Sequence, residues 1–225
     1  MLRLAVLFPE LLGTYGDAGN AAVLEARARR RGIDAEVLAV GLGDGVPAAD
    51  LYLLGGGEDG PQRLAADLLR DSTLSERVAD GARVFAVCAG LQLIGETFCV
   101  EGDDEYPGLG LVSVRTTRGE TRSVGDLAVR VGGRLLVGFE NHGGVSALGA
   151  GVEPLGTVAV GRGNDGRVDG VRAEKVWATY AHGPVLAQNP WLADEILAEL
   201  TGRDLEPLAT VADRLHAARV AALGP

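Results

Sequence analysis

A cysteine at the end of an apolar run is the residue best suited to chemistry in this sequence. Residues 83–87 are strand-forming, Cys88 follows them directly, and the small residues Ala89 and Gly90 lead into a helical stretch over 91–97. A strand-to-helix elbow needs small neighbours, because the backbone of the nucleophile is held in a crowded turn. The helix N-terminus there would also favour a thiolate. We therefore expect Cys88 to be a nucleophile, with a buried structural cysteine as the alternative.

A loop of three glycines is the second feature that suggests a reactive site. Gly55, Gly56 and Gly57 follow the apolar run 51–54, where backbone N–H groups can turn toward a ligand. In a doubly wound sheet this loop should lie beside the elbow, at the edge where such folds bind ligands. We expect backbone N–H groups of Gly56, Gly57 and Ala89 to form an oxyanion hole. By itself, a triple-glycine loop is equally compatible with a simple turn.

A base for the cysteine can be sought among three histidines. His182 follows the apolar run 176–180, so it too is predicted at the carboxyl end of a strand, and we expect it to be the general base. His142 falls in a glycine-rich stretch that reads as a turn, where a loop-ordering role fits better. His216 lies among arginines in the last predicted helix and is expected to face solvent. A second cysteine, Cys99, has none of the elbow's features.

The surrounding pattern predicts a single α/β domain over residues 1–225. Apolar runs at 2–8, 35–40, 51–54 and 83–87 alternate with helical patterns at 17–31, 61–70 and 74–79, which favours a parallel sheet covered by helices on both faces. The second half is different. Short β-like segments at 110–114, 127–131, 135–139 and 157–160 precede a last strand at 176–180. Two helices close the chain: one begins at Pro190 and ends at Gly202, and the other is a final amphipathic helix marked by Leu208, Val211, Leu215 and Ala218.

Composition narrows the classes of partner. The chain has 225 residues, of which 47% are hydrophobic and 23% charged, and its formal net charge is −10. An acidic surface repels phosphate backbones and anionic lipids, so we expect no nucleic acid or membrane partner. No run reaches the roughly 18–20 apolar residues of a membrane span, and the first apolar run is too short for a signal peptide. Two cysteines make no disulfide framework, which fits a cytoplasmic location. No metal site is predicted.

The run Cys88-Ala89-Gly90-Leu91-Gln92, the preceding glycine loop and the late His182 together resemble class I glutamine amidotransferases. The stretches 139–144 (FENHGG) and 179–184 (TYAHGP) are similar to the cobyric acid synthase-like branch. The segments 15–20 (YGDAGN) and 121–126 (TRSVGD) fit best the GatD-type glutaminase subunits of lipid II isoglutaminyl synthase. The resemblance covers nearly the whole chain, and it implies the three-layer doubly wound (flavodoxin-like) fold, mostly parallel with a β-rich second half.

The resemblance also implies a mechanism and a partner. Cys88 would attack the side-chain carboxamide of L-glutamine, and His182 would give a proton to the departing ammonia. Arg122 is the candidate for holding the substrate carboxylate, and Gln92, one helical turn beyond the nucleophile, could line the same pocket. The ammonia would pass to a MurT-type ATP-dependent ligase in a heterodimer, which amidates the α-carboxyl of D-glutamate in the peptidoglycan stem peptide.

Two positions depart from the family pattern. Pro184 stands where class I enzymes usually have a glutamate two residues after the histidine, so the expected third member of the triad is missing. We hypothesise that a partner subunit supplies the acid, or that the backbone alone orients His182. Ala86 replaces the glycine that commonly lies two residues before the nucleophile, which should still allow the elbow to form.

The single lysine excludes a phosphate loop of the Walker type. Such a loop needs Gly-Lys followed by Ser or Thr, whereas Lys175 lies between Glu174 and Val176. We therefore expect no cofactor in this chain, and ATP and Mg²⁺ only in the partner ligase.

Three alternatives remain open from the sequence. The chain could be the glutaminase subunit of a cofactor-biosynthesis amidotransferase, or a binding module or redox sensor that carries a reactive cysteine on an α/β elbow. A redox sensor usually tunes its thiol with a nearby carboxylate, and no acidic residue lies between Asp80 and Glu96. The third alternative is an inactive scaffold that has lost its triad acid.

Overall fold

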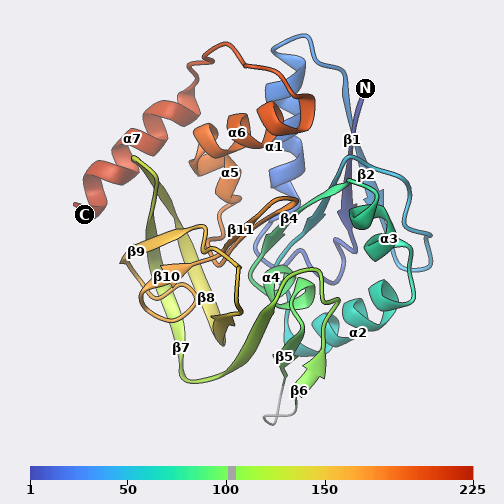
Figure 1. The fold of residues 1–225 in the computed structure, drawn as a ribbon. Helices are drawn as coiled ribbons and strands as arrows, with labels where there is room; N and C mark the ends of the chain where they lie inside the picture. The colour runs from blue at the N-terminus through green and yellow to red at the C-terminus, as the bar shows by residue number, and fades with distance from the viewer. Residues whose placement is uncertain (101–104, 225) are drawn as a thin grey trace.

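The first sheet is the parallel sheet that positions the candidate site. The computed structural model describes residues 1–100 and 105–224 (Figure 1). Strands β12, β4, β3, β1 and β2 lie parallel in that order, and β11 joins the β12 edge in antiparallel orientation. The bounds are β1 (Leu2–Leu7), β2 (Ala35–Val40), β3 (Leu51–Leu54), β4 (Arg83–Val87), β11 (Val171–Ala173) and β12 (Val176–Thr179).

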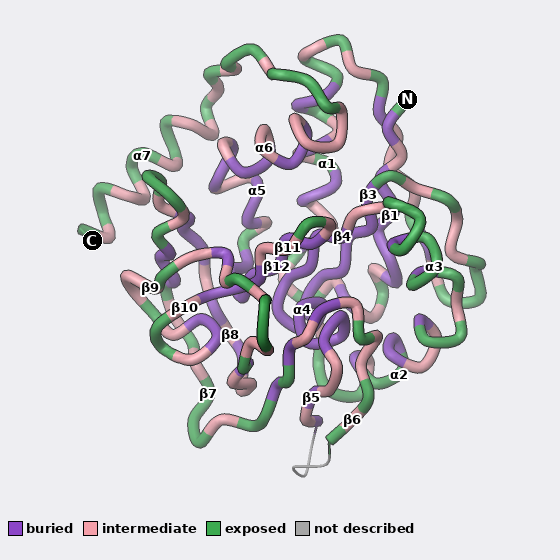
Figure 2. The backbone as a smooth tube through the Cα atoms, in the orientation of Figure 1, coloured by how far each residue is buried: buried purple, intermediate pink, exposed green. Residues whose placement is uncertain are grey.

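Helices cover both faces of this sheet, as the alternating pattern predicts. One group packs together and consists of α1 (Gly19–Arg29), α5 (Val185–Gln188) and α6 (Pro190–Thr201). The other group is α2 (Asp59–Arg70), α3 (Leu74–Ala79) and α4 (Ala89–Ile94), and Figure 1 shows the two groups on opposite sides of the strands. Strands β1, β3 and β4 are almost entirely buried between them (Figure 2), because each is a continuous apolar run.

The second half builds a second sheet whose strands are mostly antiparallel. Its order is β10-β9-β7-β5-β6, and β8 pairs with β7. The bounds are β5 (Thr97–Cys99), β6 (Glu105–Pro107), β7 (Val114–Val131), β8 (Arg134–Leu148), β9 (Gly156–Val160) and β10 (Val168–Asp169). The two sheets meet where the backbones of Phe139 and His182 exchange hydrogen bonds of 3.2 and 2.7 Å.

Three sequence predictions need correction. The short segments expected over 110–139 are instead two long strands, β7 and β8, whose register shifts between Arg118 and Ser123. The helix after the elbow spans Ala89–Ile94, so it starts and ends earlier than the expected 91–97. The last helix, α7 (Val211–Leu223), packs on β8 and α5 but buries none of its residues fully, and its Val211 and Leu215 are exposed rather than part of a core-facing stripe.

Candidate active site

Cys88 lies on a strained elbow between β4 and α4. Its φ and ψ angles are 51° and −106°, and a positive φ is rare for a residue with a side chain. The turn is anchored to the neighbouring strand, because the N–H of Cys88 donates to the carbonyl oxygen of Thr179 on β12. Gly90 must be glycine, because a Cβ there would lie 2.6 Å from the carbonyl oxygen of Leu54. The small residues after Cys88 therefore allow the elbow to press against β3, as the sequence predicts.

The thiol of Cys88 is protonated at rest. Burial and, to a smaller extent, the negative charge of Asp17 together raise its pKa to about 12. The N–H of Ala89 and the charge of Arg122 favour the thiolate, but they do not outweigh burial. This is the opposite of the lowered pKa expected from the helix N-terminus, and α4 is only six residues long. A nucleophile in this state needs a base to remove its proton.

His182 and Asp17 form a buried pair beside the elbow. Nδ1 of His182 lies 2.9 Å from Oδ2 of Asp17, and both side chains are only 1% exposed. The same carboxylate oxygen accepts the N–H of Gly56 at 2.9 Å. Asp17 therefore supplies from within this chain the acid that the sequence did not reveal. Pro184, two residues after His182, instead packs against Gly19 at the start of α1.

The Asp17 contact fixes which nitrogen of His182 can act as a base. A carboxylate oxygen only accepts hydrogen bonds, so Nδ1 of the neutral ring carries the proton and Nε2 keeps its lone pair. Nε2 is buried and has no hydrogen-bond partner within the described residues. No hydrogen bond joins it to Cys88 in this resting geometry, and such contacts are often long before substrate binds. This buried, unpaired acceptor follows β12, the strand that pairs with β4 below the Cys88 elbow, and is therefore suited to accept the thiol proton.

The glycine loop fits tightly around this pair. A Cβ on Gly55 would lie 2.1 Å from the carbonyl oxygen of Leu12, and one on Gly56 would lie 2.5 Å from Cε1 of His182. The N–H of Gly56 is committed to Asp17, so the expectation that it faces an oxyanion is wrong for this residue. The N–H of Gly57 has no acceptor in the parts of the chain that are described, and Gly57 and Ala89 both line the pocket. These two N–H groups remain available for an oxyanion.

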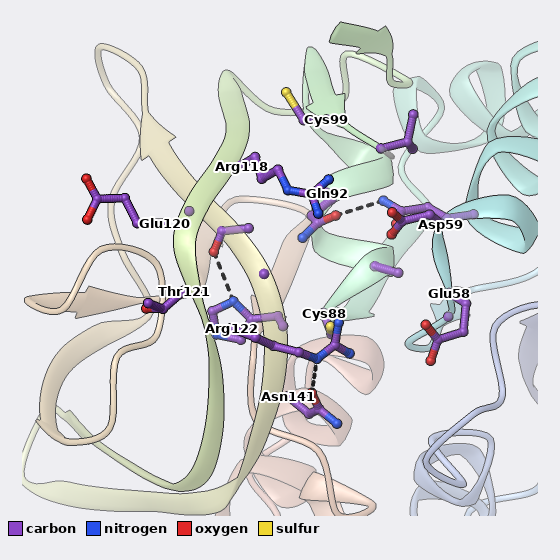
Figure 3. Close-up of a pocket in the computed structure, with 18 residues that line it drawn as sticks. Glu58, Asp59, Cys88, Gln92, Cys99, Arg118, Glu120, Thr121, Arg122 and Asn141 are labelled. Carbon is purple, nitrogen blue, oxygen red and sulfur yellow. Dashed lines mark hydrogen bonds between the residues drawn. The ribbon is translucent and has the colours of Figure 1, made fainter. Parts of the chain in front are cut away.

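The pocket above Cys88 is small and strongly polar. Its volume is about 240 Å³, and it is bounded by α2, α4 and the β7–β8 hairpin (Figure 3). Two arginines and three carboxylates line it: Arg118, Arg122, Glu58, Asp59 and Glu120. The Nε of Arg122 donates to Oδ1 of Asn141 at 2.5 Å, which leaves the Nη groups without a partner among the described residues. A pocket with charges of both signs suits a small zwitterion.

Gln92 lines the same pocket, but its amide is engaged by the protein. Oε1 accepts from Nε2 of Gln62 at 2.8 Å, and Nε2 donates to the hydroxyl of Tyr180 at 3.2 Å. That hydroxyl continues through Ser146 to Thr116, with two contacts of 2.7 Å. Gln92 therefore lies where the sequence predicted it, on the helix one turn after Cys88, and its orientation is fixed by this buried chain.

The other histidines differ from His182 in their contacts. His142 lies within strand β8 rather than in a turn, and its ring stacks on Tyr180 with 3.8 Å between ring centroids. Both of its nitrogens are engaged, one by Glu140 at 3.1 Å and one by the carbonyl oxygen of Gly144 at 2.9 Å. His216 is on α7, bonded to the carbonyl oxygen of Gln188. Among the described residues, His182 is the histidine that has a buried ring nitrogen without a hydrogen-bond partner.

Asp17 is the functional residue that sequence reasoning missed. It precedes α1 and looks like an ordinary residue at the start of a helix. One signal could have revealed it: β1 and β3 are neighbours, so the segment after β1 reaches the same sheet edge as the glycine loop after β3. Tyr15 and Asn141 likewise stand out in the sequence only as parts of the longer motifs at 15–20 and 139–144.

Across residues 1–100 and 105–224, no helix has the length and apolar character needed to cross a membrane. The same residues contain no group of three or more His, Cys, Asp or Glu side chains that could hold a metal ion.

The fold and the polar cysteine site agree with comparison to known proteins. Residues 3–190 match the CobB/CobQ-like glutamine amidotransferase domain, and the chain belongs to this family. The chain is therefore a glutamine amidotransferase, as the motifs predicted.

Curated relatives extend over most of the chain. It is 32% identical over 206 residues to the GatD subunit of lipid II isoglutaminyl synthase (glutamine-hydrolyzing) from Staphylococcus aureus, covering 87% of this chain and 84% of that one. The Streptococcus pneumoniae subunit of the same name is 31% identical over 218 residues, covering 91% and 84%. A cobyric acid synthase from Pelotomaculum thermopropionicum is 32% identical over 208 residues, which cover 81% of this chain but 37% of that protein.

Solved structures share the fold at lower identity. A glutamine amidotransferase crystal structure matches with a TM-score of 0.59 and 24% identity, covering 89% of this chain and 99% of that one. A glutamine amidotransferase from Thermotoga maritima matches with a TM-score of 0.58 and 16% identity, covering 99% and 94%. These matches confirm the expected three-layer, flavodoxin-like fold class.

Proposed function

We propose that this chain is the glutaminase subunit of a two-chain lipid II isoglutaminyl synthase. It would hydrolyse L-glutamine in the cytoplasm and pass ammonia to a MurT-type ligase, which would use ATP and Mg²⁺ to amidate the α-carboxyl of D-glutamate in the stem peptide. Two relatives that are named as this subunit, each matched over 84% of its own length, support the assignment. The observation that carries the chemistry is Cys88 on a strained elbow, beside a His182–Asp17 pair with a free Nε2.

The first half of the reaction forms a thioester. Nε2 of His182 takes the thiol proton, and the Cys88 sulfur attacks the side-chain carboxamide carbon of glutamine. Asp17 holds Nδ1 and stabilises the imidazolium that results. The N–H groups of Gly57 and Ala89 stabilise the oxyanion. The carbon–nitrogen bond then breaks, and ammonia leaves with the proton from His182.

The second half restores the enzyme. Water attacks the γ-glutamyl thioester while Nε2 of His182 accepts its proton. The sulfur leaves, takes the proton back and becomes the thiol again, and glutamate is released. The pocket recognises the amino acid end of the substrate: the free Nη groups of Arg122 bind the α-carboxylate, and Glu58 and Asp59, across the pocket in Figure 3, favour the α-ammonium.

The assignment is tested by ammonia release and by reconstitution. Wild-type protein should release ammonia from glutamine, and Cys88→Ala should not. When mixed with a MurT-type ligase, ATP and lipid II, the wild type should give amidated lipid II in the presence of glutamine, as read by mass spectrometry. Cys88→Ala should do so only when ammonium replaces glutamine. Ammonia release without any amidation of lipid II would contradict the acceptor but not the glutaminase activity.

A second candidate function is the glutaminase part of a cofactor-biosynthesis amidotransferase. The match to a cobyric acid synthase favours it, although this chain covers only 37% of that protein. Reconstitution with the ATP-dependent ligase that co-purifies with this chain would separate the two, because only one acceptor would gain an amide. A redox-sensor function is disfavoured by the raised pKa of Cys88, since sensor cysteines react as low-pKa thiolates.

A further inference from the structure

A chain of contacts connects Arg122 in the pocket to the ring of His182. Nε of Arg122 donates to Oδ1 of Asn141 at 2.5 Å, as Figure 3 shows, and Nδ2 of Asn141 donates to the hydroxyl of Tyr15 at 2.6 Å. The ring of Tyr15 lies against His182, with 4.4 Å between the ring centroids and an interplanar angle of 52°. Neither Asn141 nor Tyr15 has a role in the chemistry described above.

The direction of both hydrogen bonds between Arg122, Asn141 and Tyr15 is fixed. The Nε of arginine can only donate, so the oxygen of the Asn141 amide must face it, and the amide nitrogen must then face Tyr15. The tyrosine hydroxyl accepts that bond. An aspartate at position 141 would lose the donor, and a phenylalanine at position 15 would lose the acceptor. The two bonds thus join β7 and β8 of the second sheet to the loop between β1 and α1.

The ring of His182 depends on these neighbours for its position. One hydrogen bond to Asp17 sets the tautomer, but it does not stop the ring from tilting about that bond. Gly56 lies close against the ring near Cε1, and the ring of Tyr15 packs against it. A shift of Tyr15 would therefore release His182 from its packed position.

We propose that Asn141 and Tyr15 are positioning residues that couple capture of the substrate carboxylate at Arg122 to the placement of His182. This inference rests on the proposed glutaminase function. A carboxylate bound to the free Nη groups restricts the motion of the Arg122 guanidinium. The hydrogen bonds through Asn141 then fix Tyr15, and Tyr15 fixes the ring of His182. The α-carboxylate of glutamine then contributes to kcat as well as to KM, although it lies at the far end of the substrate from the scissile bond.

The test compares hydrolysis of the γ-carboxamide in L-glutamine and in its α-amide, which lacks the carboxylate. With Tyr15→Phe, kcat for glutamine should fall about three- to tenfold, the rate equivalent of one neutral hydrogen bond, while KM stays within about twofold. The kcat for the α-amide should hardly change, because no carboxylate engages Arg122. Asn141→Ala should lose kcat for glutamine to a similar extent, and the double variant should be no slower than the slower single variant.

Tyr106→Phe is the matched control, because its hydroxyl donates to Asp67 at 2.6 Å outside the pocket; both of its kcat values should equal those of the wild type. An equal loss of kcat for both substrates in Tyr15→Phe would overturn the coupling and leave a structural role. Additive losses in the double variant, or an effect on KM alone, would also overturn it. If the wild type fails to hydrolyse glutamine even with its ligase present, the proposed function itself falls.

Discussion

Asp17 accepts a hydrogen bond from Nδ1 of His182 at 2.9 Å, although 165 positions separate the two residues in the chain. The contact answers the question raised by Pro184, because the chain itself brings a carboxylate to the base. It also has a cost, since the charge of Asp17 raises the pKa of the Cys88 thiol. The same carboxylate is thus expected to help the base and to oppose the thiolate.

These two roles predict opposite effects of Asp17→Asn. Glutamine hydrolysis should fall by about 10²–10⁴-fold, the usual contribution of a correctly held base. Alkylation of Cys88 by iodoacetamide near neutral pH should become faster, because removing the negative charge lowers the thiol pKa. Steady-state ammonia release and the mass of the alkylated protein measure the two rates.

Asp126→Asn serves as the control for this substitution, because Asp126 pairs with Arg219 outside the pocket. It should change neither rate. A parallel loss of both hydrolysis and alkylation in Asp17→Asn would indicate general disruption of the site rather than the two separate roles.

Gly56→Ala should damage the site without unfolding the protein. An added Cβ would lie 2.5 Å from Cε1 of His182 and 3.3 Å from Oδ2 of Asp17, so the pair must move. A displacement of this kind is expected to reduce kcat about 10²-fold. Gly60→Ala, four residues further on, meets open space and should keep the wild-type kcat. Circular dichroism should show that both variants are folded, and a fully active Gly56→Ala would refute the packing described here.

Arg122→Lys tests recognition of the substrate carboxylate. Lysine keeps the charge but loses the planar fork and the bond to Asn141, so KM for glutamine should rise about 10- to 100-fold. Arg115→Lys is a suitable comparison, because Arg115 lies on the same strand and bonds to Glu96 instead. A KM that is unchanged in Arg122→Lys would place the carboxylate elsewhere in the pocket.

The buried Asp169 predicts a pH dependence of stability. Burial raises its pKa from 3.8 to about 6, despite hydrogen bonds from Thr179 and from the backbone of Tyr180. The folded state therefore binds the proton more tightly than the unfolded state. Protonated Asp169 therefore contributes to the free energy of unfolding. That contribution is fully present below about pH 4 and is lost as the pH rises through about 6, by on the order of 2–3 kcal/mol.

Asp169→Asn should remove this loss, as read by urea unfolding between pH 4 and 6. Asp165→Asn provides a contrast, because the pKa of Asp165 is lowered through its bonds to Arg167 in spite of partial burial. The contribution of Asp165 to stability is lost only as the pH falls below the pKa of a free aspartate. This variant should therefore keep the wild-type slope of stability against pH over pH 4–6. An identical slope in wild type and Asp169→Asn would contradict the burial of a raised-pKa carboxyl.

The parallel half of the fold was predictable because its strands are local apolar runs. The bounds of β2, β3, β4 and α3 match the sequence patterns, since each run is closed by a turn or by glycine. The β7–β8 hairpin was not predictable in the same way. Its middle is polar and interrupted by glycines such as Gly119 and Gly125, so only pairing between the two strands shows that each is continuous.

The candidate site likewise has parts that local sequence patterns predict and parts that depend on the whole fold. Cys88 and His182 each follow a local strand signal, so their meeting at one sheet edge could be anticipated. The Asp17 contact depends on how the segment after β1 folds over the glycine loop, which no local pattern specifies. Burial likewise decides the pKa of Cys88, and burial is set by the whole fold.

A diazo-ketone mimic of glutamine tests most directly whether Cys88 forms a covalent γ-glutamyl intermediate. Intact-mass analysis of the full chain, alone and with its ligase, should show one adduct. Peptide mapping should place it on Cys88, excess glutamine should protect against it, and Cys88→Ala should not react. His216→Gln, altered on α7 outside the pocket, should label like the wild type. An unlabelled wild type, or an adduct on Cys99 instead, would contradict the account.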